Sequence, residues 1–205
     1  MKGLYLVTPD WDDTDRLLDV TAKALDAGAT VLQYRHKTAS DALRSEQAAA
    51  LLALCRRHRV PLIINDHLSL CQQIDADGLH VGGTDSSVAS VRQHLGADKI
   101  VGASCYGDLQ LARNAAASGA SYVAFGGFYP SRVKKYEVTT PADIVSRAKR
   151  ELSVPVCVIG GMTPDNSRPL VEEGADLVAA ISSVYQSDSP SEATSAFARL
   201  FSSSR

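Results

Sequence analysis

The segment TVLQYR, residues 30–35, decides the fold. It is a short run of aliphatic and aromatic residues, with the length and composition of a buried β-strand. Similar runs recur roughly 20 to 30 residues apart along the whole chain. They are GLYLVT (3–8), PLIIND (61–66), GLHVGG (78–83), KIVGAS (99–104), YVAFGG (122–127), PVCVIGG (155–161) and DLVAAIS (176–182). With TVLQYR, these runs predict eight buried strands.

Helical patterns lie between the predicted strands. Apolar residues recur at helical spacing most clearly in segments 15–28, 40–58, 108–119 and 163–174. Several of these segments end on a glycine, as at Gly28, Gly119 and Gly174, and glycine there suits a left-handed helix cap. Strands that alternate with helices form parallel βαβ units, and eight such units can close into a barrel.

The sequence therefore predicts an α/β protein, a single (βα)8 TIM barrel domain over residues 1–205, with a tail that frays after about residue 200. An open doubly wound sheet is the alternative. Near-even spacing and the lack of a long insertion favour the closed barrel.

The bulk composition excludes several classes of protein. The chain has 205 residues, of which 45% are hydrophobic and 21% charged, as in ordinary globular proteins. A formal net charge of -2 gives no overall attraction to nucleic acid or anionic membranes. No apolar run approaches the roughly 18 to 20 residues of a transmembrane helix, and the N-terminal run is too short for a signal peptide. We expect a cytoplasmic protein.

The cysteines carry no signature of a metal or redox site. Cys55, Cys71, Cys105 and Cys157 form no CxxC pair and no cluster with histidine. Buried cysteines often behave as small hydrophobic residues. We interpret all four as reduced structural residues.

Polar residues at the end of the second strand indicate an anion pocket. In a TIM barrel, active sites lie at the C-terminal ends of the strands. Alternate strand residues share a face, so Gln33, Arg35 and Lys37 project to one side, and Tyr34 and His36 to the other. A solvated sheet edge could give the same alternation. Closure of the barrel favours the pocket.

Two carboxylates at neighbouring strand ends indicate a metal site. Asp66 and Asp85 would repel one another if buried together, and Mg²⁺, which takes one or two carboxylates plus phosphate oxygens, would resolve this repulsion. Arg35, Lys37 and Lys134 would neutralise the remaining phosphate charge. Helix capping is the alternative role for each aspartate.

The ends of the seventh and eighth strands indicate a second anion site. Gly160 and Gly161 follow the seventh strand, and small residues with hydroxyl groups follow the eighth. Loops after the last two strands of such barrels often bind phosphate through backbone N–H groups, which glycine allows to approach closely. A tight turn alone is the alternative for the glycine pair.

The chain resembles a known family. The segments LYLVT, VLQYRHK, LIIND, ADGLHVGGTD, GAS, YVAFGGFYPSRVKK, VIGGMTPDN and AAISS occur in the order and at roughly the spacing of thiamine phosphate synthase. The resemblance runs from Leu4 to about Ser183. It implies a transferase that couples an aminomethylpyrimidine diphosphate to a hydroxyethylthiazole phosphate by Mg²⁺-assisted dissociative substitution, releasing pyrophosphate. The implied partners are these two small molecules, without nucleic acid or membrane, and a homo-oligomer is possible.

The resemblance also implies the roles of individual residues. It implies a pyrimidine diphosphate site made of Gln33, Tyr34, Arg35, His36, Lys37, Asn65, Ser104 and Lys134, of which Arg35, Lys37, Ser104 and Lys134 are catalytic. It implies a thiazole phosphate site made of Ser131, Arg132, Val133, Gly161, Ile181 and Ser182. It implies Asp66 and Asp85 as the Mg²⁺ ligands. No histidine receives a catalytic role, and His80 is interpreted as a hydrogen-bonded structural residue.

The chain departs from the family pattern at three places. Val133 stands where a threonine is common, Gly83 replaces a frequent glutamine, and Pro9 and Trp11 flank an aspartate that often follows threonine directly. These differences concern substrate affinity or loop geometry.

Two other functions remain open. A related thiazole tautomerase shares the barrel but relies on a histidine in a Ser-x-His context, where this chain has Ser104, Cys105 and Tyr106. A noncatalytic barrel that binds phosphate ligands would not require both Asp66 and Asp85.

Overall fold

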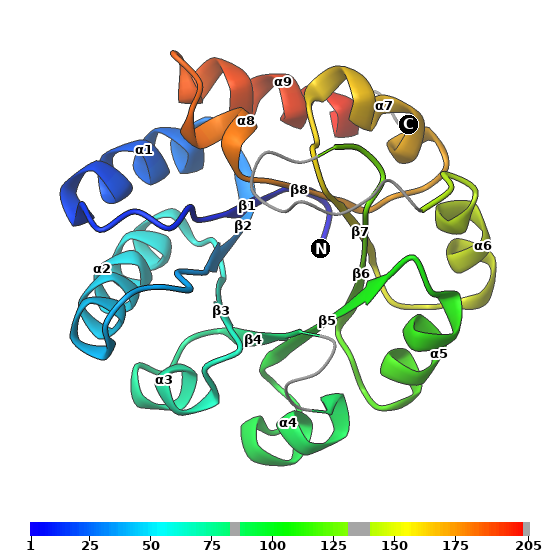
Figure 1. Cartoon of the computed structure of the whole chain (residues 1–205), viewed down its shortest axis with the longest axis horizontal. Helices are drawn as coiled ribbons and strands as arrows, with labels where there is room; N and C mark the ends of the chain where they lie inside the picture. The colour runs from blue at the N-terminus through cyan, green and yellow to red at the C-terminus, as the bar shows by residue number, and fades with distance from the viewer. Residues whose placement is uncertain (83–86, 131–139, 203–205) are drawn as a thin grey trace.

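The computed structural model describes residues 1–82, 87–130 and 140–202. Within these residues, parallel strands close into a barrel in which each strand pairs with the next and β8 pairs with β1 (Figure 1). The strands are β1 (Gly3–Val7), β2 (Ala29–Tyr34), β3 (Leu62–Asn65), β4 (Gly78–Val81), β5 (Ile100–Tyr106), β6 (Tyr122–Gly126), β7 (Val156–Ile159) and β8 (Leu177–Ala180). The closed order confirms the predicted (βα)8 barrel and excludes the open sheet.

The helices surround the barrel (Figure 1). They are α1 (Thr14–Asp26), α2 (Asp41–His58), α3 (Leu68–Gln73), α4 (Val88–Leu95), α5 (Leu109–Ala117), α6 (Ile144–Glu151), α7 (Pro164–Glu172), α8 (Ser182–Tyr185) and α9 (Pro190–Ser202). Helices α8 and α9 both follow β8, and α9 packs against α1 and α7. The helical segments predicted at 15–28, 40–58, 108–119 and 163–174 correspond to α1, α2, α5 and α7.

Local sequence explains where these helices begin and end. The Asp13 carboxylate accepts a hydrogen bond from the Arg16 N–H at the start of α1, and Ser40 caps α2 in the same way. Gly28, Gly119 and Gly174 have φ angles of 106°, 93° and 107°, a region that glycine enters without steric cost. The predicted left-handed glycine caps are therefore confirmed.

Alternation along the strands builds two apolar layers. Outward residues such as Leu4, Leu32 and Ile64 pack under the helices. Inward residues fill the barrel, and they are Tyr5, Val7, Val31, Ile63, Tyr122, Ala124, Cys157, Leu177 and Ala179. A Cβ at Gly102 would overlap the ring of Tyr122, so glycine there lets the tyrosine lie across the interior. The polar floor of the site rests on this inner layer.

All four cysteines are buried and free of disulfides, as predicted. Burial raises the pKa of the Cys55 and Cys105 thiols to about 12 and that of the Cys71 thiol to about 11. Burial also raises the pKa of the Cys157 thiol. The thiols are therefore protonated near neutral pH.

The structure describes part of the segment that is predicted to fray after about residue 200. Helix α9 continues to Ser202, and Leu200 is buried against the core. Residues 203–205 lie outside the described ranges, so fraying stays a prediction. Among the described helices, none has the length and apolar character required to cross a bilayer.

Candidate active site

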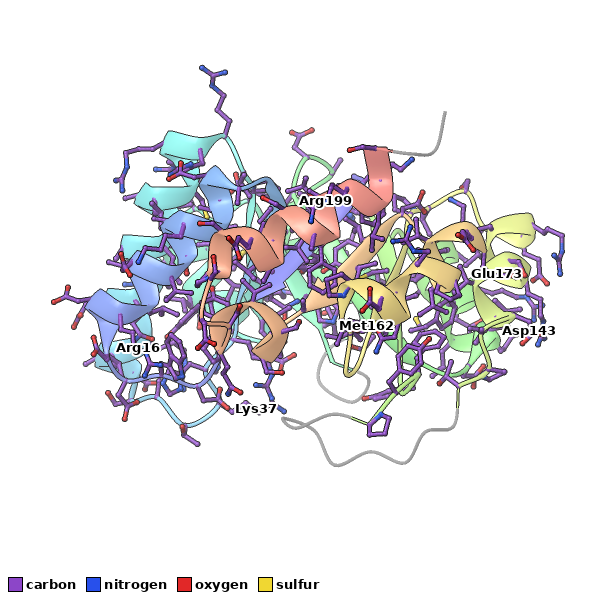
Figure 2. The ribbon with its side chains drawn as sticks, turned by 90° about the horizontal axis from the view of Figure 1, so that it is seen from above. Arg16, Lys37, Asp143, Met162, Glu173 and Arg199 are labelled. Atoms are coloured by element: carbon purple, nitrogen blue, oxygen red, sulfur yellow. The ribbon has the colours of Figure 1, made fainter. Side chains whose placement is uncertain are left out.

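A cavity of about 290 Å³ opens at the C-terminal ends of the strands. Predicted site residues from the ends of four strands, β2, β3, β5 and β8, line this cavity, and they are Gln33, Arg35, Lys37, Asn65, Asp66, Ser104 and Ile181. Figure 2 views the barrel from the side and shows Lys37 at its lower edge. A cavity therefore lies where the site is predicted, and the roles of its residues stay predictions.

The end of β2 supplies the cationic side of the cavity. Gln33 and Arg35 are almost fully buried, and Lys37 is exposed at the rim. All three line the cavity, because alternate residues continue to project inward beyond the last residue of the strand. The predicted shared direction of the three side chains is confirmed.

Tyr34 and His36 point away from this cavity, as the alternation predicts. The Tyr34 hydroxyl donates a hydrogen bond to Oε1 of Gln47 on α2, at 3.0 Å. Both residues line a second cavity of about 390 Å³, which Lys37, Asn65 and Asp66 share with the first. The resemblance implies that Tyr34 and His36 belong to the diphosphate site, and this role stays a prediction, because both residues line only the second cavity.

The end of β3 supplies a carboxylate. Asp66 has φ of 62°, a conformation that aspartate and asparagine tolerate better than most residues. Its Oδ1 accepts a hydrogen bond from the Gly82 N–H at 3.0 Å, and its Oδ2 accepts one from Nδ2 of Asn65 at 2.7 Å. These two bonds fix the carboxylate at the cavity wall.

The donor set suits a hard divalent cation. Each Asp66 oxygen that accepts one hydrogen bond retains a further lone pair. Mg²⁺ requires only one or two protein carboxylates when phosphate oxygens and water complete its shell. The described residues contain no group of three His, Cys, Asp or Glu side chains that could hold a metal by themselves. Asp66 therefore fits a shared site of this kind.

A buried hydrogen-bonded chain forms the floor of the cavity. Nε2 of Gln33 donates to the Tyr5 hydroxyl at 2.8 Å, and the Tyr5 and Tyr122 hydroxyl oxygens are 2.6 Å apart. Nδ1 of His80 lies 2.8 Å from the Tyr122 oxygen, and its Nε2 lies 2.9 Å from Oγ of Ser104. The chain therefore joins two predicted substrate-binding residues, Gln33 and Ser104, through the barrel interior.

The hydrogen atoms of this hydrogen-bonded series can be arranged so that each tyrosine hydroxyl donates one hydrogen bond. Burial raises the pKa of both tyrosines, so Tyr5 and Tyr122 remain protonated. If each tyrosine hydroxyl donates once along this series, Tyr5 accepts from Gln33 and donates to Tyr122, which donates to Nδ1 of His80. Nε2 of His80 then carries the hydrogen and donates to Ser104. In this order Ser104 accepts from His80, and its own hydroxyl hydrogen is available to an acceptor in the cavity that Ser104 lines.

The ends of β7 and β8 form another wall. Gly160 and Gly161 have φ of 115° and 64°, and a Cβ at Gly161 would overlap the Pro130 carbonyl oxygen. Ile181 lines the cavity, and Ser182 begins α8 beside it. The glycine pair thus makes a tight turn packed against the segment that follows β6, which was the alternative reading of the pair, and its phosphate role stays a prediction.

Part of the predicted site cannot be placed. Asp85, Ser131, Arg132, Val133 and Lys134 lie outside the described residues, as does Gly83. Their predicted roles stay predictions.

Among the cavity-lining residues that were not predicted for the site, Tyr5 and His80 belong to its polar floor. Tyr5 lines the cavity from β1, and His80 lines it in addition to the hydrogen-bonded structural role predicted for it. Both stand at inward positions of their strands, so the alternation that identified Gln33 could have identified them. A third residue, Asp10, contacts the cationic side from the loop after β1.

This fold and site define a class of protein. A TIM barrel whose strand ends gather cations, a carboxylate and hydroxyl groups in one cavity is typical of an enzyme that acts on phosphorylated small molecules. Residues 4–184 match the family model described as thiamine monophosphate synthase. The chain belongs to this family.

Individual relatives agree with the family match. The chain is 66% identical over 201 residues to a thiamine-phosphate synthase of Janthinobacterium sp. (strain Marseille), covering 98% of this chain and 97% of the relative. It is 44% identical over 201 residues to one of Nitrosomonas eutropha, covering 98% and 95%. The solved structure of a thiamine phosphate pyrophosphorylase from Pyrococcus furiosus superposes with a TM-score of 0.85 at 26% identity, covering 98% and 95%.

Proposed function

We propose that the chain is a thiamine phosphate synthase. It joins 4-amino-2-methyl-5-(diphosphomethyl)pyrimidine to 4-methyl-5-(2-phosphooxyethyl)thiazole and releases pyrophosphate. The family match and the relatives at up to 66% identity support this reaction. The observation that carries the proposal is one cavity lined by Gln33, Arg35, Lys37 and Asp66, because its charges complement a diphosphate and its metal.

The cationic side of the cavity assists departure of the leaving group. Pyrophosphate gains negative charge as its bond to the pyrimidine methylene carbon breaks. Arg35 and Lys37 stabilise that charge from fixed positions, Arg35 through paired hydrogen bonds and Lys37 as a point charge. Lys134 has the same proposed role, on the resemblance alone.

The proposed metal site is Asp66 together with Asp85. Mg²⁺ bound there would lower the energy of the charge on the departing pyrophosphate. Asn65 holds the Asp66 carboxylate through the 2.7 Å hydrogen bond, so it orients a metal ligand as well as lining the cavity.

The floor of the cavity orients the pyrimidine. Its electron-rich ring can delocalise the positive charge of the methylene carbon as pyrophosphate leaves, which favours a dissociative route. Gln33 and Ser104 have polar atoms fixed by the buried chain, and both can hydrogen-bond the ring edge. The thiazole nitrogen then attacks the carbon, and because it has no proton to lose, the reaction requires no protein general base. Positioning of the two substrates supplies much of the catalysis.

The thiazole phosphate is proposed to bind at the ends of β7 and β8. Ile181 lines the cavity and Ser182 follows it at the start of α8, whereas Gly161 stands two residues after the end of β7, the strand that pairs with β8. The tight glycine turn leaves backbone N–H groups close to the surface, where a phosphate can approach them. Ser131, Arg132 and Val133 would complete this subsite.

The test is an assay of the purified protein with both phosphorylated substrates. Thiamine phosphate and pyrophosphate should form only when both substrates and Mg²⁺ are present. Asp66→Asn should retain the fold, because asparagine tolerates the same backbone conformation, but should lose most Mg²⁺-dependent turnover. A wild-type protein that forms no thiamine phosphate with any divalent metal would refute the proposed function.

A further inference from the structure

The loop between β1 and α1, residues 8–13, forms hydrogen bonds with residues 35–37, the segment that contains the cationic residues Arg35 and Lys37. Arg35, His36 and Lys37 follow the last residue of β2, so no regular strand pairing fixes all of them. The Thr8 N–H donates to the Gln33 carbonyl oxygen at 3.0 Å. The Thr8 hydroxyl donates to the Arg35 carbonyl oxygen at 3.0 Å and accepts from the Arg35 N–H at 2.8 Å. Thr8 thus extends the pairing of β1 with β2 as far as Arg35.

Asp10 continues this grip where the strand pairing stops. Its Oδ1 accepts a hydrogen bond from the Lys37 N–H at 2.9 Å and a longer one from Nη1 of Arg35 at 3.4 Å. One carboxylate oxygen of Asp10 therefore accepts hydrogen bonds from the backbone of Lys37 and from the guanidinium of Arg35. The side chain of Arg35 is only 9% exposed, so few positions are available to it once Asp10 is in place.

His36, between the two cations, is held by the same loop. Its ring is fully buried, and Nε2 lies 3.0 Å from Oδ1 of Asp12. Its Nδ1 lies 4.0 Å from Oδ1 of Asp10 and has no hydrogen-bond partner among the residues that the structure describes. Three consecutive residues of the segment therefore face carboxylates of one loop.

The loop is itself anchored on both sides of Asp10. The Trp11 carbonyl oxygen accepts a hydrogen bond from Nε2 of the buried Gln47 at 2.9 Å. The Trp11 indole packs edge-on against Tyr185, with ring centres 5.5 Å apart, and the Arg16 guanidinium lies 3.9 Å from the indole centre. A carboxylate carried by a fixed backbone can fix other groups in turn.

We propose that Asp10 is a positioning residue, which holds Lys37 and Arg35 in the arrangement that receives the diphosphate. This role deepens the proposed function and rests on it. A diphosphate that meets cations already in place loses less free energy to their ordering, so binding is tighter. Asp10 acts through Arg35 and Lys37 and need not touch substrate.

Two substitutions separate the geometry of Asp10 from its charge. Asp10→Ala removes the acceptor for the Lys37 N–H, whereas Asp10→Asn keeps an oxygen acceptor and removes the charge. A carboxylate that acted only by repelling the substrate would give the opposite result, because both variants would then lower KM for the pyrimidine diphosphate. The positioning role predicts that Asp10→Ala raises this KM about 10-fold to 100-fold, the loss of one hydrogen bond to a charged group.

Three further readouts distinguish positioning from a structural role. Asp10→Asn keeps a weaker, neutral hydrogen bond, so it should raise KM clearly less than Asp10→Ala does, and KM for the thiazole phosphate should change little in either variant. Asp13→Ala is the matched control from the same loop, because the Asp13 carboxylate caps α1 through the Arg16 N–H at 2.9 Å. It should lower the midpoint of thermal unfolding while leaving KM for the pyrimidine diphosphate unchanged.

Calorimetric titration with inorganic pyrophosphate and Mg²⁺ keeps this test separate from the proposed function. Asp10→Ala should weaken pyrophosphate binding by the same factor as it raises KM, and Asp13→Ala should bind as wild type does. Equal pyrophosphate affinity in wild type and Asp10→Ala would overturn the positioning role even if the wild type turns over. A wild type without turnover, in which Asp10→Ala still weakens pyrophosphate binding, would overturn the proposed function alone.

Discussion

At the scale of single residues, the cavity-lining side chains Gln33 and Ser104 are positioned by hydrogen bonds to buried side chains. Ser104 and Gln33 both have polar atoms fixed by side chains of the barrel interior. Tyr122 lies at the centre of this arrangement, fully buried, with its hydroxyl between Tyr5 and His80. A buried polar group that loses its partner costs more than the hydrogen bond itself contributes.

Tyr122→Phe is expected to lower stability and turnover together. The substitution keeps the ring but leaves the Tyr5 hydroxyl and Nδ1 of His80 without their partner. The free energy of unfolding should fall by about 1 to 3 kcal/mol, measured by urea denaturation. Turnover should also fall, because the orientation of His80, and through it the Ser104 hydroxyl, is no longer fixed.

Tyr185→Phe is the matched control for that prediction. Its hydroxyl is also buried and bonded to one side chain, Thr21, but it lies outside the cavity. It should lower stability with little effect on turnover. Equal loss of turnover in the two variants would show that the hydrogen-bonded side chains beneath the cavity have no special role in catalysis.

At the scale of the element, strand ends bring the site together. The alternation of β2 predicted which side chains enter the cavity, because its period is two and its inner face is packed. Tyr5 and His80 were missed although they obey the same rule, since tyrosine and histidine inside a strand are also common core residues. The grip of the loop 8–13 on residues 35–37 could not be predicted, because it depends on the path of a loop that contains Pro9.

The boundaries of the helices also differ in how well the sequence predicted them. The long periodic helices α1 and α2 were predicted nearly to their ends, because their caps are visible as Asp13 or Ser40 and a following glycine or basic residue. The short helix α3 covers only Leu68–Gln73 and has no side-chain cap, so its sequence offers too few turns to show a period. Short elements of a barrel are positioned by packing more than by local propensity.

Gly161→Ala tests the turn that follows β7. The residue has φ of 64°, and an added Cβ would overlap the Pro130 carbonyl oxygen. Left-handed backbone alone costs alanine roughly 1 to 2 kcal/mol, and the overlap adds to this cost. The midpoint of thermal unfolding should therefore fall, and KM for the thiazole phosphate should rise because the turn must shift.

Gly96→Ala separates the two costs. Gly96 also has positive φ, 77°, but an added Cβ there would have no atom within 4 Å. The free energy of unfolding of this variant should fall only by the cost of left-handed backbone for alanine, and its KM for the thiazole phosphate should not change. A Gly161→Ala protein with unchanged KM would argue against a thiazole phosphate subsite at this turn.

At the scale of the whole molecule, closure of the barrel explains why residues far apart in sequence form one site. Asp66 from the end of β3 and Ile181 from the end of β8 line the same cavity because parallel strands all present their C-terminal ends to one rim. Eight recurring apolar runs were sufficient to predict this closure. Asp85, Ser131, Arg132, Val133 and Lys134 lie outside the described ranges, and their places in the site stay predictions.

The four buried thiols should report on unfolding of the whole barrel. Burial raises the pKa of Cys55 and Cys105 to about 12 and of Cys71 to about 11, against 9.0 for an unburied thiol. These shifts stabilise the fold fully below about pH 9, and this contribution is lost as pH rises towards the raised values, since the unfolded chain ionises first. The free energy of unfolding should fall between pH 9 and 11.

Alkylation with iodoacetamide at pH 8 measures the same burial directly. All four thiols should remain unmodified in native protein and become modified together in urea. Rapid modification of one thiol in native conditions would contradict the packed interior.

The most direct test of the proposed reaction is the ratio of its two products in one time course. With both substrates and Mg²⁺, thiamine phosphate and pyrophosphate should accumulate in equal molar amounts, because each new carbon–nitrogen bond releases one pyrophosphate. Release of pyrophosphate without thiamine phosphate, or with thiazole phosphate omitted, would show hydrolysis and contradict the account.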